Sequence, residues 1–207
     1  MTAYYYQGSP ILAPLSITSN QPMFSIDTVS LKQSRTAQNS QRWELSFDVL
    51  TNDNAVNLLL SSMDNLSSAQ TMVMPQLKEV DDATTIANDT DGTELFISAT
   101  GVEPAGETTI NLTRTAGQGL LPKGSFVKFS NHNKIYILKT EINFDTFTSG
   151  NVEIYPSLRV ATAVNTEMLV GAEAILRYYT SIDNASGITY SDGILASPGK
   201  IDIVEAL

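Results

Sequence analysis

Apolar and polar side chains alternate strictly from Trp43 to Val49, and this pattern constrains the fold more than any other feature of the chain. The apolar members are Trp43, Leu45, Phe47 and Val49, and the residues between them are Glu44, Ser46 and Asp48. Successive side chains of a β-strand point to opposite faces of a sheet, so this period predicts a strand with one buried face. The chain is therefore expected to build a sheet that covers a core.

Two further runs predict a β-hairpin. Residues 126–129 and 135–138 are rich in β-branched and aromatic side chains, and the polar Asn131-His132-Asn133 between them reverses the chain. Ser149-Gly150-Asn151 is interpreted as a second reversal that opens another strand. Pro156 ends that strand or lies at a sheet edge, because proline has no N–H to donate to a ladder.

One segment has helical periodicity. Apolar residues between Asn54 and Ser68 recur at spacings of three and four, which is the pattern of one helix face. Further strands are predicted at 23–27, 95–97, 110–112, 174–179 and 201–204. A β-bulge near Thr28, or two separate strands, would account for a change of apolar phase there, and the strand at 174–179 is apolar on both faces. The sequence therefore predicts a mainly β fold, an antiparallel β-barrel or sandwich with one flanking α-helix.

The 207 residues contain no repeat and no low-complexity linker, so a single domain spanning 1–207 is expected. Residues 70–93 are acidic and lack periodicity, which indicates an exposed segment, and residues 182–207 are expected to form an extended C-terminal arm. The chain has no cysteine, which excludes disulfides and thiolate sites. No apolar run approaches the ~20 residues that cross a bilayer, so no membrane partner is expected.

The charge balance argues against nucleic acid as a partner. The chain has 12 basic and 22 acidic residues, a formal net charge of −10. Binding of phosphates depends on clustered lysine and arginine side chains that displace counterions. No sequence-specific contact with nucleic acid is therefore expected.

Side chains with catalytic potential are few. The single histidine, His132, lies in the predicted hairpin turn, where an exposed residue is a more natural interpretation than a member of a catalytic triad. A glycosidase pair could come from Glu79, Asp81 and Asp82, or from Asp89, Asp91 and Glu94. Both sets lie in the most polar part of the chain, whereas a general acid needs an apolar setting. Residues 88–94 resemble a calcium loop only in part, and a plain turn is the alternative.

No phosphate-binding glycine loop, Gly-x-Ser-x-Gly or His-Glu-x-x-His motif is present. We therefore predict that the protein is not an enzyme and has no catalytic residue, no cofactor and no metal site. The clustered tyrosines at 4–6 and 178–179 could stack on sugars, which keeps a carbohydrate-binding module open as an alternative. Tyrosines also serve as anchors of protein interfaces.

The order of motifs resembles the distal tail and baseplate-hub family, the minor structural proteins of tailed bacteriophages. A strand with Arg42-Trp43 is followed by the helical segment at 54–68. A glycine-containing strand at 123–129, a Lys134-Ile135-Tyr136 strand and a closing Pro156-Ser157-Leu158-Arg159 complete the resemblance, which covers about residues 23–179.

This resemblance implies a virion protein of the tail tip or baseplate, assembled in the host cytoplasm. Its subunits would form a homo-oligomeric, hexameric ring around a central channel, joining the tail tube protein to baseplate hub and fibre proteins. The alternative in the same setting is a fibre-associated module for host attachment. Side chains expected at such an interface are Arg42, Tyr136, Arg159, Tyr178 and Tyr179.

Overall fold

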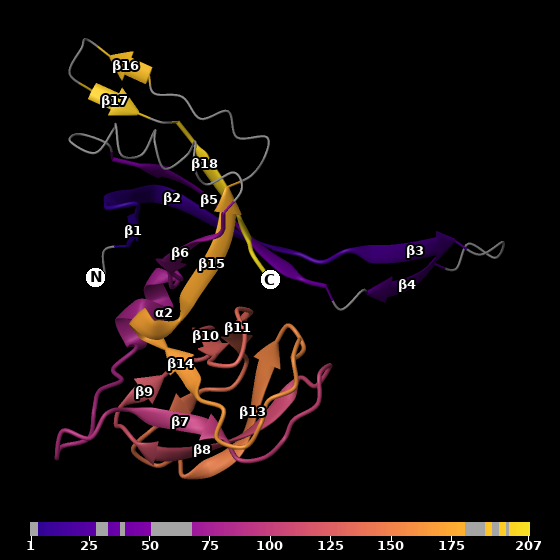
Figure 1. Ribbon diagram of the computed structural model, residues 1–207, viewed down its shortest axis with the longest axis vertical. Coiled ribbons are helices and arrows are strands. Elements are labelled where there is room, and N and C mark those ends of the chain that lie inside the picture. Colours follow the sequence, from indigo (N-terminus) through magenta and orange to yellow (C-terminus); the bar gives the residue numbers. More distant parts are fainter. Residues whose placement is uncertain are drawn as a thin grey trace. The chain divides into compact units, whose positions relative to one another are not determined.

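The computed structural model describes residues 4–27, 33–37, 40–50, 68–180, 189–191, 195–197 and 199–207. In this part of the chain the fold is mainly β, with antiparallel sheets and one short α-helix, α2 (Lys78–Ala83), which confirms the predicted fold class (Figure 1). None of the helices in these ranges has the length and apolar character needed to cross a membrane. The helix predicted at 54–68 and the bulge predicted near Thr28 lie outside the described residues.

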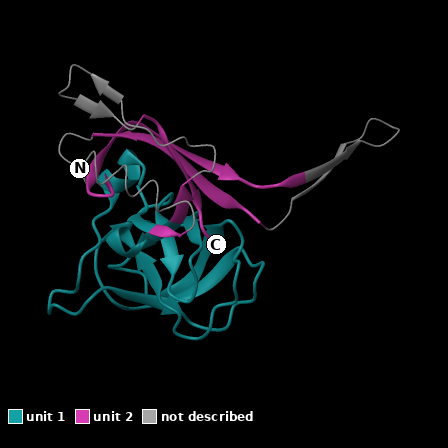
Figure 2. Ribbon diagram, turned by 45° about the horizontal axis from the view of Figure 1, so that its top comes forward, with its two compact units in different colours: residues 1–4, 71–177 teal, residues 5–70, 178–207 magenta. Residues whose placement is uncertain are grey.

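The chain divides into two compact units (Figure 2). Unit 1 comprises Met1–Tyr4 and Thr71–Arg177, and unit 2 comprises Tyr5–Gln70 and Tyr178–Leu207. Most of unit 1 is thus an insertion in the sequence of unit 2. The sequence predicts a single domain because it shows no linker, but both borders of the insertion fall inside strands, where no linker composition could mark them.

Six antiparallel strands of unit 1 form one sheet in the order β14-β10-β11-β13-β8-β7. They are β7 (Phe96–Ala99), β8 (Thr109–Ala116), β10 (Phe126–Phe129), β11 (Ile135–Leu138), β13 (Ser149–Tyr155) and β14 (Met168–Val170). An isolated bridge between Ser98 and Glu167 joins the two edge strands, and the N–H of Ala99 donates to the carbonyl of Thr166 at 2.8 Å. The sheet is therefore nearly closed into a small barrel.

Alternating inward side chains of these strands fill the barrel. The buried core contains Ile97, Ala99, Ile110, Leu112, Leu121, Val127, Phe129, Tyr136, Leu138, Ile142, Phe144, Val152, Ile154, Leu158, Met168 and Val170. A short ladder of β9 (Leu120–Leu121) with β12 (Ile142–Asn143) contributes two of them. The predicted β10–β11 hairpin is confirmed. The predicted reversal at Ser149-Gly150-Asn151 is wrong, because these residues pair with β8 and begin β13.

The acidic segment at 70–93 is more ordered than the sequence suggests. It begins with β6 (Gln70–Val73) and continues into α2, whose Val80 is buried. Beyond the helix, the N–H of Thr85 donates to the carbonyl of Leu120 at 3.0 Å, and Ala87 forms a bridge with Gln118. Glu79, Asp82 and Asp91 of this segment are exposed, but its backbone is hydrogen-bonded to the barrel.

Unit 2 is built on an antiparallel sheet in the order β1-β2-β5-β18-β15, and β15 continues into unit 1, where β6 is its neighbour. The strands are β1 (Tyr5–Tyr6), β2 (Ser9–Asn20), β5 (Arg42–Val49), β15 (Ile175–Thr180) and β18 (Ile201–Glu205). Two separate hairpins, β3 (Met23–Asp27) with β4 (Gln33–Ala37) and β16 (Thr189–Ser191) with β17 (Leu195–Ser197), complete the unit.

The strand predicted at 43–49 is confirmed as β5, whose apolar side chains are all buried while the polar ones between them are partly exposed. The ring of Phe47 packs on Tyr6, and Tyr6 lies 5.9 Å from Tyr178 between ring centroids. The C-terminal residues do not all form an arm. β18 lies between β5 and β15 in the middle of the sheet, because its apolar face completes the same core.

Candidate interaction surfaces

Of the three acidic residues of α2, Asp81 is half-buried and accepts a hydrogen bond from the hydroxyl of Tyr4 at 3.3 Å, whereas the other two are solvated. Glu79 and Asp82 are exposed, and the ammonium group of Lys78 donates to Asp82 at 2.5 Å. This hydrogen bond holds the pKa of the Asp82 carboxyl below its usual value. A general acid of a glycosidase needs a raised pKa, so the shift is opposite to that which the hydrolase alternative requires.

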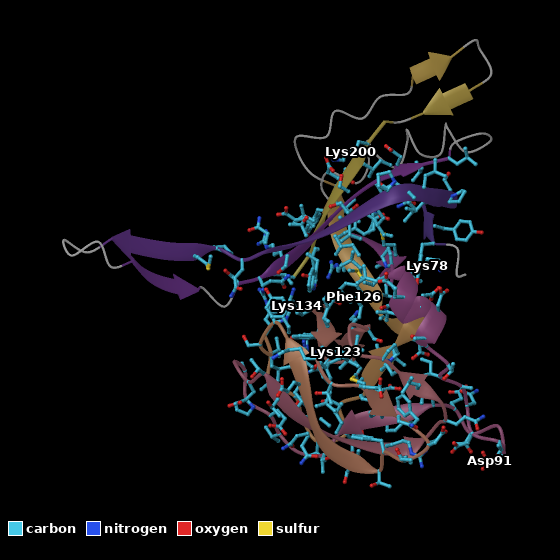
Figure 3. The ribbon with its side chains drawn as sticks, turned by 180° about the vertical axis from the view of Figure 1, so that it is seen from behind. Lys78, Asp91, Lys123, Phe126, Lys134 and Lys200 are labelled. Carbon is cyan, nitrogen blue, oxygen red and sulfur yellow. The ribbon has the colours of Figure 1, made fainter. Side chains whose placement is uncertain are left out.

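Residues 88–94 form a turn whose polar atoms bond to the backbone. Asp91, on this outlying turn (Figure 3), accepts from the N–H of Thr93 at 2.9 Å, and this bond lowers the pKa of its carboxyl. Asp89 accepts from the N–H of Gly117 at 2.9 Å. Within the described ranges, no group of three or more acidic or histidine side chains is arranged to hold a metal. The geometry favours the plain turn over the calcium loop.

His132 is half-buried in a directed chain of hydrogen bonds, so the prediction of an exposed turn residue is wrong. The amide of Asn131 donates to the carbonyl of Ala161 at 2.9 Å, which leaves its oxygen to accept from Nδ1 of His132 at 2.6 Å. Nε2 of His132 then accepts from the hydroxyl of Tyr136 at 2.7 Å, and that hydroxyl accepts from the N–H of Arg159 at 2.9 Å. A neutral imidazole with its proton on Nδ1 satisfies every hydrogen bond of this arrangement.

Protonation of His132 is therefore unfavourable in the folded protein. Burial, together with the positive charges of Lys128, Arg159 and Lys134, lowers the pKa of the imidazole to about 4. The residue connects the hairpin turn to the loop before β14. It has the setting of a structural histidine.

We expect the stability of the protein to fall as the pH drops from about 6.5 towards 4. In this window the unfolded chain binds a proton on His132 that the folded chain does not bind, so unfolding is favoured. The contribution reaches at most about 2 kcal/mol between pH 6.5 and 5. Urea unfolding of the wild type and of His132→Gln at both pH values measures it. Equal changes in the two proteins would show that His132 makes no contribution.

The five side chains predicted at an interface fall into two groups. The rings of Tyr136 and Tyr178 are completely buried within their own units, so neither offers a surface to a partner. Burial also raises the pKa of the Tyr178 hydroxyl, which accepts a hydrogen bond from the side-chain amide of Gln7 at 3.1 Å. Arg42, Arg159 and Tyr179 are exposed. The period of a strand cannot distinguish a core tyrosine from an interface tyrosine.

The same burial limits the carbohydrate alternative. Of the tyrosines near the N-terminus, Tyr6 is buried, whereas Tyr5 is 56% exposed. Of the pair in β15, only Tyr179 reaches solvent. Stacking on sugars needs open ring faces, and each cluster supplies fewer of these than the sequence indicates.

The outer edge of strand β2 is a candidate interaction surface that the sequence patterns did not indicate. β1 covers it only at Ser9 and Pro10, and β5 pairs with its other side. From Ile11 to Thr18 no described strand pairs with the outer edge. The strand has no charged residue, and it contains a register shift between Leu12 and Ser16. The sequence feature that could have indicated this edge is the absence of charge from all twelve residues of β2 in an acidic chain.

The hairpin of β3 and β4 continues the chain from β2 and returns it to β5. Its five pairs run from Met23 opposite Ala37 to Asp27 opposite Gln33. Among the described strands it forms a sheet of its own, without a third strand. We call it the β3–β4 arm.

No protein-family model matches the chain, and comparison with curated proteins also gave no match.

Proposed function

We propose that the protein is a structural subunit of the tail tip or baseplate of a tailed bacteriophage. The β3–β4 arm is the observation that carries this proposal. A two-stranded ribbon is at best marginally stable in water, and three strands or a packed face are usually needed for independent stability. An arm of five residue pairs, with no third strand among the described residues, is thus expected to gain its stability from a neighbouring molecule.

The open edge of β2 supports the same role. An edge strand presents unpaired N–H and C=O groups that can pair with another chain, and soluble proteins protect such edges with charges, proline or a bulge. β2 has Pro14 and a register shift before Ser16, but its stretch from Ser16 to Asn20 has neither proline nor charge, although the whole chain carries a net charge of −10. Two copies of the chain, whose net negative charges repel each other elsewhere, can therefore approach along β2.

In this proposal the subunits form a closed ring, hexameric as the resemblance implies, around a central channel. Contacts that are not self-complementary close into rings when the rotation between subunits allows it. The ring would join the tail tube protein to hub and fibre proteins in the virion. Its work would be mechanical, with no reaction and no cofactor.

Shortening the arm is expected to abolish assembly. A variant that joins Pro22 directly to Gln38 removes β3 and β4 and leaves a short loop between β2 and β5. We expect its association constant to fall by about 100-fold or more, equivalent to roughly 2.7 kcal/mol. Light scattering with negative-stain imaging of the same fractions measures the change, with the full chain as the reference.

The buried Trp43 beside the new loop provides the control for folding, since its emission should remain that of a buried indole. Assembly of the shortened protein to the same mass as the full chain would count against the role of the arm. Antibody labelling of the source virions tests the location itself. Absence of the protein from the particle would end the proposal.

A further inference from the structure

The β3–β4 arm and the strand that leads into it have outer edges on opposite sides of one ribbon. β2 pairs with β5 and β3 pairs with β4, both antiparallel, and only Gln21 and Pro22 separate β2 from β3. The outer edge of β3 therefore continues the outer edge of β2, whereas the outer edge of β4 lies on the other side of the ribbon. Within the described ranges, no third strand pairs with either edge of the arm.

The backbone groups of Ile17 point away from β5. In an antiparallel pair of strands, hydrogen-bonded and non-hydrogen-bonded residue pairs alternate. The N–H of Leu50 donates to the carbonyl of Pro10 at 3.1 Å, so the even-numbered residues of β5 bond to β2. Ile17 lies opposite Leu45, between two such pairs. Its N–H and C=O are therefore directed to the outer edge, where no described strand pairs with β2 between Ile11 and Thr18.

The strand around Ile17 is regular and carries none of the usual protection. Charges, proline or a bulge normally prevent a sheet edge from pairing with another chain. Pro14 and the register shift of β2 both lie before Ser16. The five residues from Ser16 to Asn20 carry no charge and pair with β5 without a further shift. This part of the edge can therefore accept another strand.

β4 is the strand of the arm that fits this edge better. It has five residues, as many as the stretch from Ser16 to Asn20, and contains one arginine and no acidic residue. β3 ends in Asp27, which would bring a further negative charge to a chain with a net charge of −10. An extended segment that joins a sheet edge gains main-chain hydrogen bonds along its length.

The β4 strand that joins this edge has to come from a second copy of the chain. Within one copy, pairing with β3 holds β4 on the far side of the ribbon from the outer edge of β2. Two β2 edges could instead pair with each other, but that contact would leave the arm as a two-stranded ribbon, which is marginally stable. Pairing of β4 with β2 gives the arm a third strand and covers the edge of β2 in one contact.

We infer that β4 of one copy joins the sheet of a second copy at the outer edge of β2, around Ile17. The inference rests on the proposed function, because it names the contact through which the arm connects neighbouring subunits. The contact uses two different edges, one from each copy. Each copy therefore keeps one edge for the next subunit, as a head-to-tail ring requires.

Two variants that each lack one of the two edges test this contact by sedimentation velocity. The arm-shortened protein, in which Pro22 is joined to Gln38, keeps the edge of β2. Ile17→Pro keeps the arm and removes the outward N–H, a change that edge strands tolerate. Each variant alone is expected to self-associate at least about 10-fold more weakly than the full chain. Mixed together they should form a 1:1 heterodimer and nothing larger, because one arm and one intact β2 edge remain.

A second edge variant covers the case in which Ile17→Pro does not fold, as judged by tryptophan emission. It combines Ser16→Lys with Thr18→Lys, since both side chains are exposed and lysine on an edge strand discourages pairing. Ser149→Lys with Asn151→Lys is the matched control. These exposed residues have the same spacing on β13, which has a neighbouring strand on both sides. The control should assemble like the full chain.

Three outcomes overturn the inference. The first is a mixture of the arm-shortened protein and an edge variant that stays monomeric. The second is an edge variant that assembles like the full chain, or a control variant that is weakened as much as the edge variant. The third is an arm-shortened protein that still forms dimers, which would indicate pairing of two β2 edges. If the arm-shortened protein loses assembly while the edge variants do not, the proposed function stands and only this contact is rejected.

Discussion

Replacing Gly119 with alanine is expected to lower the free energy of unfolding of unit 1 by about 3 kcal/mol. Gly119 has a φ of +93°, a conformation that residues with a side chain rarely adopt. A Cβ atom at this position would lie 2.2 Å from the carbonyl oxygen of Thr85 and 2.7 Å from its carbon. Because both are backbone atoms, no rotation of a side chain can relieve the contact.

The expected loss has two sources. The left-handed conformation itself costs about 1–2 kcal/mol for a residue with a Cβ atom. Separation of the two segments also weakens the hydrogen bonds between Thr85 and Leu120, which lie at 3.0 Å in both directions. Each such bond contributes about 1 kcal/mol. This clash would release the segment after α2 from the barrel.

Gly106→Ala is the matched control. Gly106 has a similar φ of +99°, but no atom lies within 4 Å of the position of its Cβ. Its loss should therefore be limited to the conformational part, about 1–2 kcal/mol. Chemical denaturation of both variants followed by circular dichroism compares them. Equal losses would show that the contact with Thr85 is absent in solution.

Phe129→Ala is expected to destabilise unit 1 by about 3–5 kcal/mol. The ring is completely buried in the barrel, 5.6 Å from Tyr136 and 6.1 Å from His132 between ring centroids. Its removal leaves a cavity and withdraws one wall of the hydrogen-bonded chain at His132. Urea denaturation measures the loss, and Val102→Ala, at an exposed position of the same unit, should change stability by no more than about 0.5 kcal/mol.

The fluorescence of Trp43 extends this experiment to unit 2, since the only tryptophan of the chain is buried there. If unit 1 unfolds first, unit 2 must hold its two parts together across a loop of about 100 residues. Closing such a loop costs about 4 kcal/mol in chain entropy. We therefore expect Phe129→Ala to shift the Trp43 transition as well. A Trp43 transition identical to that of the wild type would indicate independent units.

Periodicity predicted the strands whose two faces differ. β5 was evident because each of its apolar residues is buried and each residue between them is partly exposed. β10 and β11 were evident because a polar turn separates two runs of strand-forming residues. In these elements the local pattern and the tertiary burial agree, so one sequence suffices to find them.

Elements set by distant contacts were not predictable. Ser149-Gly150-Asn151 has the composition of a turn, yet pairing with β8 makes it a strand. α2 forms in a segment without a clear apolar period, where only Val80 is buried. The insertion was also hidden, because its borders lie in β6 and β15 and carry the composition of strands.

The candidate surfaces were predicted only in part. Arg42, Arg159 and Tyr179 lie on the surface as expected, whereas Tyr136 and Tyr178 belong to the cores. The exposed Val102, Val160 and Val164 lie in loops, where no period exists to indicate which side chain faces solvent. The open edge of β2 depends on the absence of a neighbouring strand from Ile11 to Thr18 in the part of the chain that the structure describes, which is a property of the topology.

The chain enters and leaves the barrel on neighbouring strands, and this has a consequence for how such a protein can change. β6 and β15 adjoin in the sheet, and the N–H of Met74 donates to the carbonyl of Ala174 at 3.0 Å. A segment whose ends meet in this way can be shortened to a hairpin turn, or exchanged for another fold with adjacent termini, without stretching the host sheet. The same host sheet can therefore carry different inserted domains between β6 and β15.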